Sequence, residues 1–222
     1  MNRTWLTLGV TMCATACTSE LQTVEIQNCT NLSLRDQVEL VVSHAGPMAL
    51  RVSEDVTLDI ERGLTLGGSG QANLTCSEVT NVQTLGHSSL YVKRAPNLLS
   101  LRAYGQSEVA IDEIGTAMLE IRASGQAKIA IGMLDADQLE LQGGGESQVA
   151  ISGSTGDARL NLAGDAIVDA GALQTQNVSL SGPGTGAVSL WATAHLEISS
   201  DVVREADIKG TPDITDGREE SR

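Results

Sequence analysis

The sequence predicts an all-β protein that folds as a parallel β-helix, or β-solenoid, with coils of about 20 residues. Three observations predict this fold class. Similar stretches recur along the chain, each contains two short pieces that alternate apolar and polar residues, and a glycine separates the two pieces. The composition agrees, because Val, Ile, Leu and Ala dominate the apolar residues, 23 residues are Gly and none is Phe.

The repeat is clearest in the middle of the chain, where three units follow one another without a gap. They read LLSLRAYGQSEVAI, MLEIRASGQAKIAI and QLELQGGGESQVAI, at 98–111, 118–131 and 138–151. Looser units lie at 64–76, 159–171, 177–190 and 195–210, and 85–92 reads as a shortened unit. A unit this short cannot bury its own apolar face, so it must stack on copies of itself.

Each unit holds two predicted strands. The first has the form L-x-L, as in Leu119 and Ile121 around Glu120, and the second the form V-x-I, as in Ile129 and Ile131. Alternation with a period of two puts the apolar side chains on one face of a strand. We therefore expect strands that stack in register at about 4.8 Å, wound as a right-handed helix.

A glycine lies between the two strands of the unit. Gly70, Gly105, Gly125 and Gly145 occupy this place in four units. Here the chain leaves one strand and bends toward the next, and a positive φ or close backbone stacking selects glycine. We expect these four glycines to form corners of the coil, a structural role that is favoured over a ligand-binding loop.

The first residues, MNRTWLTLGVTMCATAC, are typical of a bacterial lipoprotein signal. Arg3 precedes an apolar run too short to span a membrane, and small residues at 14–16 precede Cys17. We expect Cys17 to become the lipidated, palmitate-bearing first residue of the mature chain. Because Ala14 stands where a leucine is commonest, a plain secreted or periplasmic protein is the alternative.

The expected domain organisation follows from this signal and from the repeat. Residues 1–16 are a signal peptide, 17–22 a short tether, 23–214 the β-solenoid domain and 215–222 a polar tail. An Asp directly after the lipidated cysteine would be an inner-membrane sorting residue, but in this chain Thr18 stands at that position. We therefore expect an exported protein of the cell envelope, an outer membrane lipoprotein that faces the periplasm or the cell surface.

The chain is acidic, with 28 Asp and Glu against 14 Lys and Arg and a net charge of −14. Such a surface repels nucleic acid and anionic lipid headgroups, so we expect no nucleic-acid partner. The expected partners are a membrane, reached through the lipid anchor, and an envelope or extracellular protein or glycan that the sequence does not identify.

Two cysteines remain in the predicted mature domain, Cys29 and Cys76. An exported protein folds in an oxidising compartment, so a disulfide between them is an expectation, although sequence alone does not bring them together.

No cofactor or metal is expected from the sequence. His44, His87 and His195 lie in different units without ligand spacing. Asp135 and Asp137 could form a loose calcium site but read as solvated acids in a turn.

The alternative function is a polysaccharide lyase or hydrolase built on a β-helix. Such an enzyme needs clustered carboxylates and aromatic side chains that stack on sugars. Only Tyr91, Tyr104 and Trp191 are aromatic after residue 16. We expect a non-enzymatic binding or structural module with no catalytic residues.

A family resemblance rests on the repeat and on both of its flanks. The flanks are TVEIQNCTNLSLRDQVELVV at 23–42 and LEISSDVVREADIKGTPDI at 196–214. Together they resemble the head GIN domain family of putative auto-transporter adhesins (DUF2807), over residues 23–214. The resemblance implies an exported β-helix, often an envelope lipoprotein, with an adhesin-like role and no catalytic residues. Ala103 and Tyr104 depart from the small turn residues usual in the family, which does not affect the expected fold.

Overall fold

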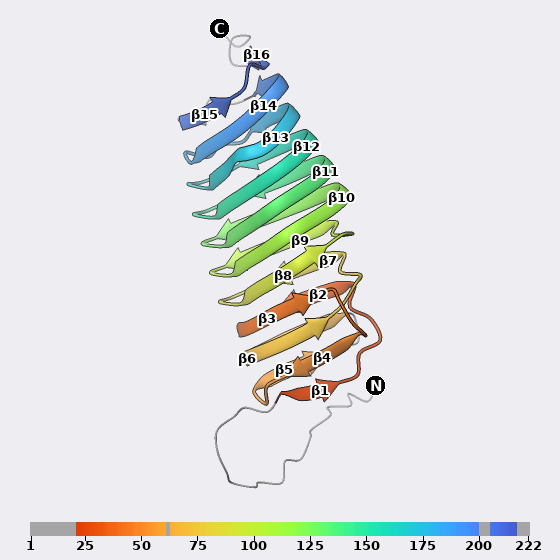
Figure 1. Ribbon diagram of the computed structural model, residues 1–222. Coiled ribbons are helices and arrows are strands. Elements are labelled where there is room, and N and C mark those ends of the chain that lie inside the picture. The colour runs from red at the N-terminus through yellow and green to blue at the C-terminus, as the bar shows by residue number, and fades with distance from the viewer. Residues whose placement is uncertain (1–20, 61–62, 200–204, 217–222) are drawn as a thin grey trace, which may run out of the picture.

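The computed structural model describes residues 21–60, 63–199 and 205–216, which form one tall stack of strands (Figure 1). The predicted signal peptide and Cys17 lie outside these residues. All strands of the described residues belong to a 16-stranded sheet that winds along the stack, and from β7 onward its ladders are parallel. The prediction of a parallel β-helix is confirmed. The described part of the chain offers no helix that could cross a membrane.

Apart from β6, the strands are short at the N-terminal end, and they are long in the middle, where they run through corners of the coil. In chain order they are β1 Gln22–Val24, β2 Asn31–Leu34, β3 Gln37–Ser43, β4 Ala49–Val52, β5 Val56–Asp59, β6 Leu64–Thr75, β7 Asn81–Thr84, β8 Ser89–Ala95, β9 Ser100–Gly105, β10 Glu108–Gly125, β11 Lys128–Gly143, β12 Gln148–Leu162, β13 Ile167–Ser181, β14 Ala187–Ile198, β15 Glu205–Lys209 and β16 Asp213–Asp216.

One coil, residues 118–137, shows how the sequence makes three sides. The first side points Leu119, Ile121 and Ala123 inward, the second Ile129 and Ile131, and the third Leu134 and Ala136; all seven are buried. The residues between them face outward, so each side follows the period of two. We call the outward surfaces the first, second and third face, and a glycine corner joins the first side to the second.

Like residues lie over like residues from coil to coil. The column through Ile121 contains Leu101, Leu141, Leu160 and Leu180 in successive coils, all at most 2% exposed. Each coil thus buries its apolar side chains on its neighbours, which explains why a unit of this length recurs.

The coil step is 20 residues between Val109, Ile129 and Val149, and 19 residues between Val149 and Val168. The expectation of a shortened unit at 85–92 is wrong. Strands β7 and β8 form a complete coil, because Asn81 pairs with Ser100 at a step of 19 residues.

The N-terminal coils do not stack in chain order. The sheet runs β4, β6, β2, β7 and β9, so the unit at 64–76 lies on one side of the 31–43 coil and the 81–95 coil on the other. Strands β4 and β5 run antiparallel to β6 and β1 runs antiparallel to β4, which closes this end of the stack (Figure 1). The chain from Cys76 to Asn81 therefore crosses the edge of the 31–43 coil, which lies between the 64–76 unit and the 81–95 coil.

Candidate functional site

The corner glycines form a column in which backbones stack closely. Gly105, Gly125 and Gly145 have φ of 77°, 77° and 66°, the left-handed region. A Cβ on Gly125 would lie 2.8 Å from the carbonyl oxygen of Gly105. Gly86 and Gly164 share the column, and Asp36 continues it as the one described non-glycine residue with positive φ.

The placement of Gly70 in this column is wrong. Gly70 pairs with Val38 inside the ladder of β3 and β6, two residues beyond the corner. Gly68 takes the corner position, with a φ of 91°, and its N–H donates to Oδ2 of Asp36 at 3.1 Å. Residues 64–70 contain three glycines, and the register of β6 against β3 decides which of them occupies the corner of the coil.

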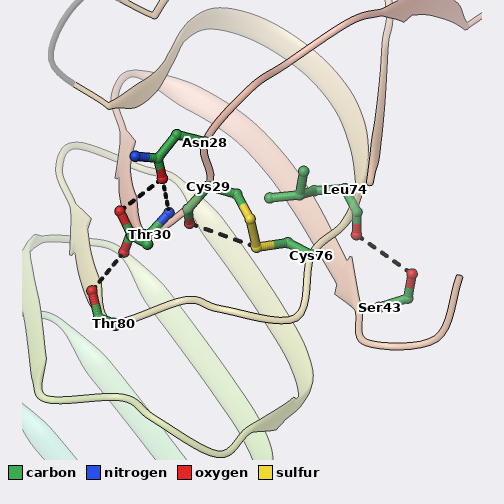
Figure 2. The surroundings of a disulfide bond; sticks show 7 residues. All are labelled: Asn28, Cys29, Thr30, Ser43, Leu74, Cys76 and Thr80. Atoms are coloured by element: carbon green, nitrogen blue, oxygen red, sulfur yellow. Dashed lines mark hydrogen bonds between the residues drawn. A yellow bond between two sulfur atoms is a disulfide. The ribbon is translucent and has the colours of Figure 1, made fainter. Parts of the chain in front are cut away.

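Cys29 and Cys76 are joined by a disulfide in the structure, with their Cα atoms 6.2 Å apart (Figure 2). Cys29 lies two residues before β2 and Cys76 immediately follows β6, so the bond ties two coils together where the chain passes between them. The carbonyl oxygen of Thr30 accepts hydrogen bonds from N–H of Thr80 and of Asn81, both at 2.9 Å. The disulfide and these hydrogen bonds hold the segment from Cys76 to Asn81, which connects β6 on one side of β2 to β7 on the other.

The second face carries a shallow apolar trough of about 440 Å³. Its floor is a ladder of Ala110, Ala130 and Ala150, one from each of three successive coils. Tyr91, 38% exposed, closes one end, and Ile167, 46% exposed, stands at the other. The sequence shows the three alanines as outward residues, but the trough arises only because the register stacks them.

Charged pairs border this trough. Nζ of Lys128 lies 3.2 Å from Oε1 of Glu108 on the neighbouring coil. The hydroxyl of Tyr91 donates to Oδ2 of Asp112 at 2.5 Å, and this hydrogen bond, with desolvation and the nearby negative charge, raises the pKa of the Tyr91 phenol. The trough therefore combines an apolar floor with a polar border.

The first face carries the charged stripe read from the repeat. Glu120 stacks on Glu140, and its Oε1 accepts from Nε of Arg122 at 2.5 Å. Arg102 is farther away, with 3.8 Å between its terminal nitrogen and Oε2 of Glu120. Glu120 is thus paired with surface arginines, and Oε1 of Glu140 accepts from Nε2 of Gln142 at 3.1 Å, in agreement with an ordinary charged sheet face.

Within the described residues no group of three or more His, Cys, Asp or Glu is arranged to hold a metal ion. Asp135 and Asp137 both lie exposed on the third face.

Comparisons with known proteins agree with this architecture. A family model described as "Putative auto-transporter adhesin, head GIN domain" (DUF2807) matches residues 89–212. A search of curated proteins finds no match.

Several solved structures share the fold. A crystal structure of a putative adhesin from Parabacteroides distasonis is similar with a TM-score of 0.77 and 16% identity, covering 88% of this chain and 91% of that one. One of a putative lipid binding protein from the same species has a TM-score of 0.72 and 17% identity, covering 89% and 92%.

A third, of a putative adhesin from Parabacteroides merdae, has a TM-score of 0.56 and 14% identity, covering 88% and 95%. At these identities the structures establish the fold alone, whereas the family model covers more than half of the chain. The chain therefore belongs to the head GIN domain family of putative auto-transporter adhesins.

Proposed function

We propose that the protein is an adhesin-like binding module of the cell envelope and that it binds its partner through the second-face trough. The observation that carries this proposal is the uncovered apolar floor formed by Ala110, Ala130 and Ala150. Side chains on stacked strands are held more rigidly than side chains on loops, which reduces the entropic cost of binding. Membership of an adhesin family supports the same role.

The trough suits a partner with an apolar edge flanked by polar groups. Small alanine side chains let such an edge approach the sheet closely, Tyr91 offers a ring and a hydroxyl, and Lys128 and Glu108 offer charges at the border. An extracellular or envelope protein or glycan of that shape is the proposed partner.

Ala130→Arg tests this proposal, because it places a long charged side chain in the middle of the trough floor. The matched control is Ser154→Arg, which adds the same side chain at an exposed position on the third face. We expect labelled A130R protein to bind intact cells of the source organism at least about tenfold more weakly than wild type, and S154R to bind normally. Equal binding by both variants would exclude the trough as the binding surface.

The second part of the proposal is that a lipid on Cys17 holds the protein in a membrane, as an outer membrane lipoprotein. The signal-like order of residues 1–17 supports it. Cys17→Ala should release the protein from the membrane fraction and abolish incorporation of labelled palmitate, whereas Cys13→Ala should change neither. The lipid anchor would be excluded if the C17A protein stayed in the membrane fraction and the wild-type protein incorporated no labelled palmitate.

The third part is that binding occurs without catalysis. Among the described residues, the acids Glu108, Glu113 and Glu120 are each at the surface and paired with a cation at 3.2, 2.6 and 2.5 Å. A glycosidase instead places two carboxyl groups on either side of the scissile bond, one of them kept protonated. Release of reducing or unsaturated sugar from a broad polysaccharide panel by the purified protein would support the enzyme alternative.

A further inference from the structure

A second trough, polar and about 400 Å³ in volume, lies on the first face at the N-terminal end of the stack. The residues that carry its chemistry come from three strands and the turn after β2: Asn31, Ser33, Arg35, Asn81, Gln83 and Arg102. They are neighbours only because β2, β7 and β9 are adjacent in the sheet. We call this hollow the first-face trough.

Two arginines from different coils line the trough, in an otherwise acidic protein. Strands β2 and β9 are two strand spacings apart, about 10 Å. Among the described residues the guanidinium of Arg35 has no ion-pair partner, and Arg102 reaches Glu120 only at 3.8 Å. Glu120 is held more closely by Arg122, at 2.5 Å. Both arginines thus keep most of their capacity to bind an added anion.

The acid nearest to Arg35 in sequence does not compete for it. Oδ2 of Asp36 accepts a hydrogen bond from N–H of Gly68 at 3.1 Å, and Asp36 lines a different hollow beside Gly86 and His87. Among the described residues, none that lines the first-face trough is an acid.

Amide and hydroxyl groups line the rest of the trough: Ser33 and Gln83 share the column of Arg102, and Asn31 and Asn81 lie two residues earlier on their strands. Nδ2 of Asn81 donates to Oδ1 of Asn31 at 2.8 Å, which leaves Nδ2 of Asn31 and Oδ1 of Asn81 without partners among the described residues. Gln83 likewise has no side-chain partner there. The hydroxyl oxygen of Ser33 is buried and has no hydrogen-bond partner among the described residues, so it is available to a ligand on the trough floor.

We propose that the first-face trough binds a glycan through a sugar residue that carries a carboxylate. Guanidinium groups bind carboxylates through paired, charge-assisted hydrogen bonds, and the free amide groups match the donors and acceptors of sugar hydroxyls. Acidic peptides share the carboxylate but lack the vicinal hydroxyls, so the amides favour the glycan. This inference goes beyond the second-face proposal and does not depend on it.

The overall charge of −14 restricts the ligand further. A dense polyanion would meet repulsion from the whole surface, whereas one carboxylate is governed by the arginines beside it, because salt screens charges beyond about 8 Å at physiological ionic strength. The trough therefore selects sugars with isolated carboxylates.

Titration calorimetry of the purified protein with a trisaccharide in which one glucuronic acid is flanked by two neutral sugars, at physiological ionic strength, tests the proposal. Arg35→Gln and Arg102→Gln each remove one guanidinium and should weaken binding at least about tenfold. Arg159→Gln is the matched control, an exposed arginine of the same face outside the trough, and should change the Kd less than about twofold. The methyl ester of the trisaccharide should bind at least about tenfold more weakly than the acid.

Three results would overturn the proposal: no binding of the trisaccharide by wild type, equal binding of acid and ester, or equal loss in R35Q, R102Q and R159Q. Tighter binding of a triglutamate peptide than of the trisaccharide would reassign the trough to an acidic peptide and overturn it as well. The A130R variant should bind the trisaccharide normally. Loss of cell binding in A130R with the trisaccharide still bound would separate the two troughs, and failure of either leaves the other standing.

Discussion

Replacing Gly125 by alanine tests whether backbone stacking at the coil corner sets the stability of the solenoid. Gly125 has a φ of 77°, and its Cβ would lie 2.8 Å from the carbonyl oxygen and 3.1 Å from the nitrogen of Gly105. A side chain in the left-handed region costs about 1–2 kcal/mol. Pushing two stacked backbones apart adds about 1–3 kcal/mol, as in other overpacked sites. The expected loss in free energy of unfolding is therefore about 2–5 kcal/mol.

Thermal unfolding followed by circular dichroism measures this loss. For a chain of this length each kcal/mol lowers Tm by about 2–4 °C, so G125A should unfold about 4–20 °C below wild type. The matched control is Gly115→Ala on the same strand, where φ is not positive and no heavy atom lies within 4 Å of the added Cβ. G115A should keep or slightly raise Tm, because alanine reduces the entropy of the unfolded chain by about 0.4–1 kcal/mol.

The difference between the two variants is the test. If both unfold within about 1 °C of wild type, which is below the smallest loss expected, the corner glycines do not hold the coils together. If G115A lowers Tm as much as G125A does, a general sensitivity of this strand to replacement of glycine explains the result, and the stacked glycine column has no special role.

Three further predictions follow from burial, topology and charge. Ile131→Asp should unfold or truncate the stack, because Ile131 is 2% exposed and an aspartate there is a buried unpaired charge. Lys128→Glu, on the exposed side of the same strand, should shift Tm by no more than about 2 °C. Equal effects of the two substitutions in melting curves would refute the register. Cys76→Ser should lower the free energy of unfolding by about 4 kcal/mol on the chain-entropy model for a loop of 47 residues; an unchanged denaturation midpoint would contradict this. Asp112→Asn should return the pKa of Tyr91 toward its ordinary value, which would appear as a phenolate absorbance transition at lower pH than in wild type. The hydrogen bond stabilises the fold below the ordinary pKa of about 10, and this contribution is lost as pH rises through the raised pKa. An unshifted transition would contradict the contact.

The regular coils were predictable because their information is local and repeated. In residues 98–151 the apolar pairs, the glycine and the next apolar pair recur at one spacing, and stacking in register buries these apolar residues except Leu99, which is 51% exposed while Leu98 is buried in its coil. The column of Gly105, Gly125 and Gly145 followed from the same register. The alanine floor of the second-face trough was visible as outward residues for the same reason.

The order of the N-terminal coils was not predictable from the pattern. The first strands at 31–34, 64–66 and 81–84 carry equivalent inward pairs, apolar except for Thr84, so any of them fits beside any other. Which strand pairs with which depends on the antiparallel strands β4 and β5 that occupy one side of β6. The prediction for Gly70 is wrong for the same reason, because the spacing of the clean repeat puts the corner at Gly70 whereas the pairing with β3 puts it at Gly68.

The irregular end of the stack is therefore the place where side chains from distant parts of the sequence can meet. A strictly repeated coil can offer only columns of similar residues, such as the alanines of the second face. The exchange in order of β6 and β2 instead brings Arg35 and Asn31 beside Asn81 and Arg102, a mixture that no single unit encodes. The disulfide between Cys29 and Cys76 lies at the passage that fixes this order, so it stabilises the fold and keeps the first-face trough assembled. Reduction should accordingly weaken binding at the first-face trough more than binding at the second-face trough, whose floor is built from coils stacked in chain order.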